Sequence, residues 1–148
     1  MIRCQQEDRN MAVVEELIRT EGNGTISFGN YALSTKSKVD GFEFEGDLYK
    51  VKTFREITKL ERNGMFVYES VPGTTVKNLK ASDTGISFQV EGPEDAQITI
   101  ELADEVEYKV FVDDVNVGKM KTNLGGKLNL SVELNEGTPV AVRIEKAV

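Results

Sequence analysis

The sequence of 148 residues contains no histidine, no tryptophan and a single cysteine, and each absence removes a class of site. Histidine is the commonest metal ligand in proteins and the commonest general acid or base, so its absence excludes His-containing catalytic triads and ordinary zinc sites. With Cys4 alone, the chain forms no intramolecular disulfide and no cysteine-based metal cluster. We therefore expect no catalytic residue, metal site or cofactor of these types, and we favour a protein that is not an enzyme.

Long apolar runs and blocks of positive charge are also missing. No segment approaches the roughly 18 consecutive apolar residues of a membrane-spanning helix. The net charge is −7, so the summed field of the protein repels nucleic acid and anionic lipid. No run rich in lysine and arginine offsets this repulsion. We expect neither nucleic acid nor a membrane as a partner.

The first ten residues differ from the rest of the chain. Residues 1–10 are polar and lack the apolar stretch of a secretory signal. The regular pattern opens at Met11, which is a candidate for the true start of the protein. We expect residues 1–10 to form a disordered leader and the protein to be cytoplasmic.

The chain does contain strict alternation of apolar and polar residues, most clearly in its second half. A period of two places one side chain inward and the next outward, which is typical of strands with one buried face. The alternating segments are Ile86–Val90, Ile98–Leu102, Tyr108–Val112, Val115–Val117, Leu128–Leu134 and Val140–Ile144. Turn residues separate them, as in Gly92-Pro93-Glu94-Asp95. The pattern predicts an all-β fold, an antiparallel β-sandwich of short hairpin-connected strands.

The first half predicts further β-hairpins. Asn23-Gly24 and Asn63-Gly64 each separate two strand-like segments. Asn-Gly favours a type I′ turn, because both central residues of that turn need positive φ. Glu45-Gly46-Asp47 predicts a third turn. Segment Ala12–Ile18 has apolar residues at helical spacing, but its continuity into the first hairpin favours a strand.

Pro72-Gly73 is the best internal boundary, because this turn pair separates the two patterned halves. It divides the chain into an N-terminal hairpin-rich region (residues 11–72) and a C-terminal sandwich-like region (residues 73–148). Two interpretations stay open: two small β subdomains, or two sheets of one compact domain.

Carboxylates gather at several turns, around Glu43–Asp47, Glu91–Asp95 and Asp113-Asp114. Carboxylates that face each other can hydrolyse glycosides, and calcium takes oxygen ligands of this kind. However, turns also collect aspartate because its side chain completes a turn hydrogen bond. No segment reproduces an EF-hand calcium loop. We therefore favour turn chemistry over a metal or catalytic site at these positions.

Aromatic residues are the remaining candidates. Met65–Tyr68 is apolar on both strand faces, with Phe66 and Tyr68 expected on the same face. Phe111 is expected on the strand face opposite to that of its neighbours Val110 and Val112. Strands that are apolar on both sides are usually sandwiched between layers or lie at a subunit interface. Phe66, Tyr68 and Phe111 are therefore the candidate surface for binding or self-association.

The runs Asp47–Phe54 and Ile57–Gly73 resemble a family of short bacterial proteins of unknown function, some of which are labelled endosialidase. The resemblance covers about Met11 to Lys146 and implies a carbohydrate-active protein. The fragment Ala81–Phe88 is similar to the Asp-box of sialidases, Ser-x-Asp-x-Gly-x-Thr-Trp, with departures at Ala81, Ser87 and Phe88. In sialidases this box is a structural hairpin, so a single copy predicts one tight turn. A whole sialidase propeller needs far more chain than 148 residues.

These observations favour a non-catalytic β module, an accessory or interaction protein that binds a protein partner or self-associates through an apolar strand face. The alternative is a carbohydrate-active protein. It would be either an endosialidase-like hydrolase with carboxylates near Glu43–Asp47 or Glu91–Asp95, or a glycan-binding module. A deep cleft with two facing carboxylates would favour the hydrolase.

Overall fold

The computed structural model describes residues 13–147, which form thirteen β-strands and no helix. The expected leader, residues 1–10, lies outside the described residues. The strands are β1 (Ile18–Glu21), β2 (Thr25–Phe28), β3 (Ser37–Phe44), β4 (Asp47–Phe54), β5 (Ile57–Arg62), β6 (Met65–Val71), β7 (Thr75–Ser82), β8 (Gly85–Glu91), β9 (Ala96–Glu101), β10 (Glu107–Val112), β11 (Val115–Lys121), β12 (Lys127–Val132) and β13 (Val140–Lys146). Within this part of the chain, no helix exists that could cross a membrane.

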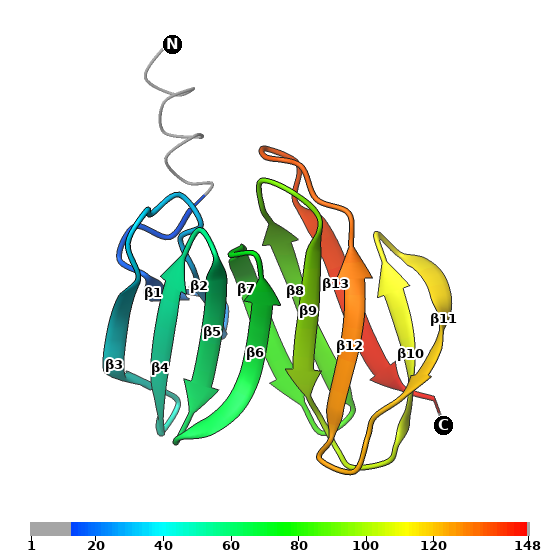
Figure 1. The fold of residues 1–148 in the computed structure, drawn as a ribbon. Coiled ribbons are helices and arrows are strands. Elements are labelled where there is room, and N and C mark those ends of the chain that lie inside the picture. Colours follow the sequence, from blue (N-terminus) through cyan, green and yellow to red (C-terminus); the bar gives the residue numbers. More distant parts are fainter. Residues whose placement is uncertain (1–12, 148) are drawn as a thin grey trace.

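The strands form two open antiparallel sheets that pack face to face (Figure 1). The seven-stranded sheet has the order β1-β2-β7-β8-β13-β10-β11, and the six-stranded sheet has the order β12-β9-β6-β5-β4-β3. The predicted all-β class and antiparallel sandwich are confirmed. The alternating segments of the second half all form strands. β8, β9, β12 and β13 bury their apolar positions between the two layers, whereas Val115 and Val117 of the edge strand β11 are exposed.

The core lies between the sheets and centres on Tyr68, which is entirely buried. The Tyr68 ring meets Phe28 and Phe88 edge to face, with ring centroids 5.3 Å and 5.7 Å away. Such T-shaped pairs are favoured because the positive ring edge meets the negative ring face. Phe28 and Phe88 belong to the seven-stranded sheet and Tyr68 to the six-stranded one, so this cluster joins the layers.

Both sheets combine strands from either side of the predicted boundary at Pro72-Gly73. β1 and β2 join the seven-stranded sheet, although they precede this turn, and β9 and β12 join the six-stranded sheet, although they follow it. A single cluster of buried hydrophobic residues contains side chains from both halves. In the described residues, the two regions are therefore intertwined and do not form separate sandwiches.

The predicted hairpins occur, but their turns differ. Asn63 and Gly64 have φ of 53° and 79°, as a type I′ turn requires. At the first hairpin, only Gly24 has positive φ, and the loop between β1 and β2 is three residues long (22–24). The strand expected over Ala12–Ile18 is wrong for its described part, because β1 begins only at Ile18. Leu17 has φ of 74°, which interrupts an extended chain.

The fragment that resembles an Asp-box is a tight turn between β7 and β8, as predicted. Gly85 closes this turn beside β13. A Cβ atom at Gly85 would lie 1.9 Å from the carbonyl oxygen of Ile144. Glycine is therefore required here because the backbone of another strand passes too closely for a side chain.

Candidate functional site

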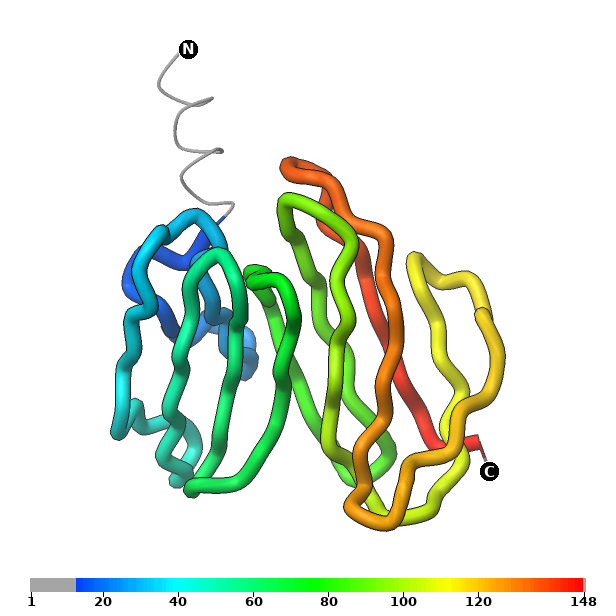
Figure 2. Tube along the Cα trace, viewed as in Figure 1, coloured from blue at the N-terminus to red at the C-terminus, as the bar shows by residue number. Residues whose placement is uncertain are grey.

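Five loops meet at one end of the sandwich, the upper end in Figure 2. They are the β2–β3 loop (residues 29–36), the β4–β5 turn (55–56), the β6–β7 loop (72–74), the β8–β9 loop (92–95) and the β12–β13 loop (133–139). We call this region the loop end. Loops on a rigid β framework commonly carry binding sites, so the geometry of the loop end decides what the protein can hold.

A buried network of hydroxyl groups lies beneath these loops. The Thr58 hydroxyl donates to the carbonyl oxygen of Thr74 (2.8 Å) and accepts from the Thr74 N–H (3.0 Å). Thr58 also shares a 2.8 Å hydrogen bond with Thr53, whose oxygen accepts from the Asn30 N–H. The Thr74 hydroxyl contacts Tyr68 and Ser70 at 2.7 Å and 2.8 Å. Polar groups buried with all partners present fix one arrangement of the chain.

Backbone hydrogen bonds tie three of the loops to each other. The Arg55 N–H donates to the Leu33 carbonyl oxygen, and the Gly73 N–H donates to the Arg55 carbonyl oxygen, both at 2.9 Å. At Gly73 the backbones almost touch, since a Cβ atom there would lie 2.0 Å from the Phe54 carbonyl oxygen. Gly73 therefore permits the close approach that holds the β6–β7 loop on the β4–β5 turn.

The buried carboxylate of Glu91 ties the β2–β3 loop and the β12–β13 loop to β8. Its Oε2 atom accepts hydrogen bonds from the Tyr31 hydroxyl (3.0 Å) and from the Gly137 N–H (2.8 Å). Burial, followed by the negative charge of Glu91, raises the pKa of the Tyr31 phenol well above its usual value. In the next loop, Asp95 accepts from the Leu134 N–H at 3.1 Å. Both carboxylates thus hold loops in place.

The loops surround a groove of about 840 Å³, a volume within the range of ligand sites. Its apolar lining comes from Tyr31, Ala32, Val71, Pro72 and Pro93. Its charged lining comes from Glu56, Glu94, Glu136 and a single cation, Arg55. Val71 is 52% exposed although it is apolar. The groove therefore combines apolar side chains with predominantly acidic ones.

The two predicted carboxylate clusters lie at opposite ends of the sandwich. Glu43–Asp47 belongs to the β3–β4 hairpin, at the lower end in Figure 1, and Glu91–Asp95 belongs to the loop end. The two clusters therefore do not face each other across a cleft. Among residues 13–147, no group of three or more Asp, Glu, Cys or His side chains is arranged to hold a metal ion.

The sequence-based prediction is wrong for Tyr68, which is a core residue and not part of a binding surface. On β6, Phe66 pairs with Glu61 and Tyr68 pairs with Leu60, so Val67 is an extra residue in the ladder. This β-bulge breaks the alternation. Phe66 therefore points outward while both Val67 and Tyr68 are buried.

Phe66 and Phe111 lie on outer sheet faces, but a cation covers each ring. Lys59 and Lys127 hold their ammonium groups 5.7 Å and 4.6 Å from the centroid of Phe66. The guanidinium of Arg143 lies 4.0 Å from the centroid of Phe111. Such cation–π contacts are favourable at exposed sites. Neither residue therefore offers the uncovered apolar face that the sequence suggested.

Sequence reasoning missed most of the groove, because its lining residues range from position 31 to position 136. Only the turn that contains Pro93 and Glu94 and the turn pair that contains Pro72 were identified from the sequence. The chain was compared with protein-family models, curated proteins and solved structures, and none of them matches it.

Proposed function

We propose that this protein is a non-catalytic β module that binds a partner protein through the groove at the loop end. The segment that fits is extended and carries basic side chains next to apolar ones. The observation that carries this proposal is the composition of the groove: three glutamates and one arginine stand among apolar side chains. Complementary charge guides such encounters and selects the partner.

The rigidity of the groove supports the same proposal. The hydroxyl network and the Glu91 carboxylate fix the loops before any ligand is present. A surface that is already ordered loses little conformational entropy on binding, so more of the contact energy remains as affinity. Two carboxylates of the Glu91–Asp95 cluster are engaged in this structural role, which leaves Glu94 free to meet a ligand.

The test uses two short fluorescein-labelled peptides, one with alternating lysine and valine and the other with alternating glutamate and valine. We expect the basic peptide to raise the anisotropy when the protein is titrated, and Glu94→Gln with Glu136→Gln to weaken its binding. The loss should be about two- to thirtyfold, since each of the two exposed ion pairs contributes about 0.2–1 kcal/mol. Glu43→Gln with Glu107→Gln removes the same charge away from the groove and is the matched control.

Two outcomes would overturn the proposal. The first is equal loss of basic-peptide affinity in the groove variant and in the control, which would mean that net charge alone attracts the peptide. The second is sustained turnover of polysialic acid by the pure protein, which would establish the endosialidase activity that the resemblance implies. Light scattering on the same samples tests the self-association that the sequence also suggested.

A second candidate function, glycan binding, is favoured by a hollow of about 260 Å³ on the outer face of the seven-stranded sheet. Its lining includes Asn78, Ser87, Gln89 and Arg143. Amide, hydroxyl and guanidinium groups of this kind orient polar ligands such as sugars. Nuclear magnetic resonance titration with neutral oligosaccharides tests this function, and shifts confined to residues around Gln89 that vanish in Gln89→Ala would support it.

A further inference from the structure

Three lysines stand in one row on the outer face of the six-stranded sheet. Lys38 on β3 pairs directly with Lys52 on β4, and Lys52 pairs directly with Lys59 on β5. Val39 and Val51, which adjoin Lys38 and Lys52 along the chain, pair with each other and face inward. Lys38 and Lys52 therefore face outward. Neighbouring strands are about 5 Å apart. The row therefore spans about 10 Å, starting at β3, the outermost strand of the sheet.

The positive charge of this row is uncompensated at its β3 end, at Lys38 and Lys52, whereas Glu69 on β6 pairs directly with Lys59 at the other end. Like charges directly opposite each other destabilise a sheet. Among residues 13–147, no carboxylate lies within 4.0 Å of the ammonium groups of Lys38 or Lys52, and Lys59 meets only Glu61, at 3.6 Å. Elsewhere on this face, by contrast, Lys127 is paired with Glu101 at 2.9 Å. In a chain with net charge −7, a row of this kind points to an anionic ligand.

An apolar row runs beside the lysines, two residues away on β4 and β5, and continues onto β6. Phe54 on β4 pairs with Ile57 on β5. Val71 follows Ser70 on β6, and Ser70 pairs with Thr58, so Val71 lies beside Ile57. Phe54 and Ile57 are half-buried and Val71 is exposed. Residues two apart on a strand are separated by about 7 Å. A charged row and an apolar row thus lie side by side on the outer face of the six-stranded sheet.

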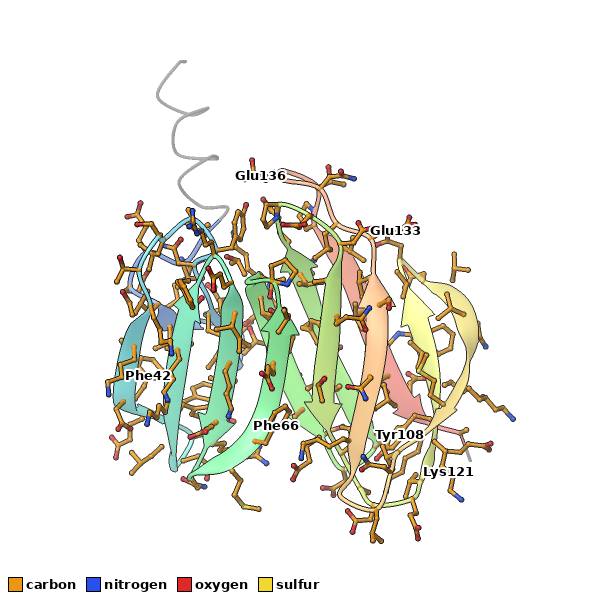
Figure 3. The ribbon with its side chains drawn as sticks, in the orientation of Figure 1. Phe42, Phe66, Tyr108, Lys121, Glu133 and Glu136 are labelled. Atoms are coloured by element: carbon orange, nitrogen blue, oxygen red, sulfur yellow. The ribbon has the colours of Figure 1, made fainter. Side chains whose placement is uncertain are left out.

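The arrangement of the two rows favours a polypeptide over a sugar or a nucleic acid as the ligand. Phe66, labelled on β6 in Figure 3, carries the ammonium groups of Lys59 and Lys127 over its ring. The Phe66 ring is therefore already occupied, and the apolar contacts on this face come from the separate row of Phe54, Ile57 and Val71. An extended polypeptide directs alternate side chains to opposite sides, which matches two rows of different chemistry.

We propose that this face binds an acidic segment of a partner polypeptide, extended from β3 to β6 between the two rows. Acidic side chains at alternate positions contact Lys38, Lys52 and Lys59, and the intervening apolar side chains contact Phe54, Ile57 and Val71. This surface differs from the groove in position and has the opposite charge. The inference goes beyond the proposed function and does not depend on it, although Val71 borders both surfaces.

The test uses the glutamate–valine peptide with the full chain. We expect Lys38→Gln with Lys52→Gln to lower the affinity for this peptide about two- to thirtyfold, because each exposed ion pair contributes a factor of about 1.4 to 5.4. Lys109→Gln with Lys119→Gln is a matched control on the other sheet, since Lys109 and Lys119 also pair across strands. The groove variant Glu94→Gln with Glu136→Gln should keep its affinity for the acidic peptide.

Several results would overturn the inference. One is equal weakening by the row variant and by the matched control. Another is that single-stranded oligothymidine or a sulfated polysaccharide binds more tightly than the peptide and loses affinity in the row variant, which would assign the row to that polymer. If the protein binds the acidic peptide but not the basic one, the proposed function of the groove is refuted and this inference stands. The two failures are therefore distinguishable.

Discussion

Replacing Thr58 by valine tests whether the buried hydroxyl network holds the loop end together. Thr58 lies entirely within the core, and its hydroxyl has three partners: the carbonyl oxygen and N–H of Thr74, and the Thr53 hydroxyl. Valine keeps the shape of the side chain and removes all three hydrogen bonds. Each buried polar group left without a partner costs about 1–3 kcal/mol, so the lower limit for three groups is about 3 kcal/mol.

This loss is large compared with the total stability of a domain, which is about 5–15 kcal/mol. We expect urea unfolding of Thr58→Val, followed by circular dichroism, to show a lower midpoint with an unchanged m-value. The melting temperature should fall by about 6–12 °C, since 1 kcal/mol corresponds to about 2–4 °C in a chain of this size. Affinity for the basic peptide should fall as well, because the β6–β7 loop starts at the network.

The matched control is Thr99→Val on β9. Thr99 makes the same kind of side-chain hydrogen bond, to Asn129, but on the exposed outer face of the sheet. Water replaces the lost partner there, so we expect a change below about 0.5 kcal/mol. A destabilisation of less than about 1 kcal/mol in Thr58→Val, or equal effects of the two substitutions, would refute the argument that this network is structurally decisive.

Three further predictions concern packing and pH. Gly73→Ala should destabilise the protein by about 3 kcal/mol or prevent folding, because its Cβ atom would meet the Phe54 carbonyl oxygen at 2.0 Å; in Gly22→Ala, where nothing lies within 4 Å, thermal melting should be nearly unchanged. Tyr68→Ala should cost about 3–5 kcal/mol in urea unfolding and Phe66→Ala only about 1 kcal/mol; equal losses would contradict the bulge that separates the two rings. The pKa of Tyr31 is raised by burial and by Glu91, and the pKa of Tyr68 is raised by burial. Above the usual tyrosine pKa of about 10, the unfolded chain therefore releases protons that the folded chain keeps, and stability is lost as pH rises. Tyr31→Phe should reduce that slope by about 1.4 kcal/mol per pH unit in unfolding titrations at alkaline pH, and an unchanged slope would contradict the raised pKa.

Alternation along the chain was a reliable guide where a strand keeps a regular ladder with its neighbours. β8, β9, β12 and β13 all bury the residues that the pattern placed inward. On β6 the same rule misplaced Tyr68, because the extra residue Val67 shifts the alternation by one position. A bulge depends on how the partner strand is paired, and the sequence of β6 alone carries no sign of it.

The candidate surfaces could not be predicted in the same way. No short stretch of sequence is rich in lysine, and yet Lys38, Lys52 and Lys59 become neighbours once β3, β4 and β5 pair in register. The groove likewise assembles side chains from Tyr31 to Glu136. Both surfaces depend on which strands and loops meet, and that is a property of long-range pairing.

The sequence by itself therefore determined the all-β class, most of the strands and the positions of the turns. These features follow from local chemistry, namely the two-residue period of a pleated strand and the positive φ that Asn, Asp and Gly tolerate. Tertiary structure alone decided how the halves before and after Pro72 interleave, which aromatic rings are buried and where charges gather. Those outcomes depend on strand order and register, which are selected by the packing of the two sheets around a common core.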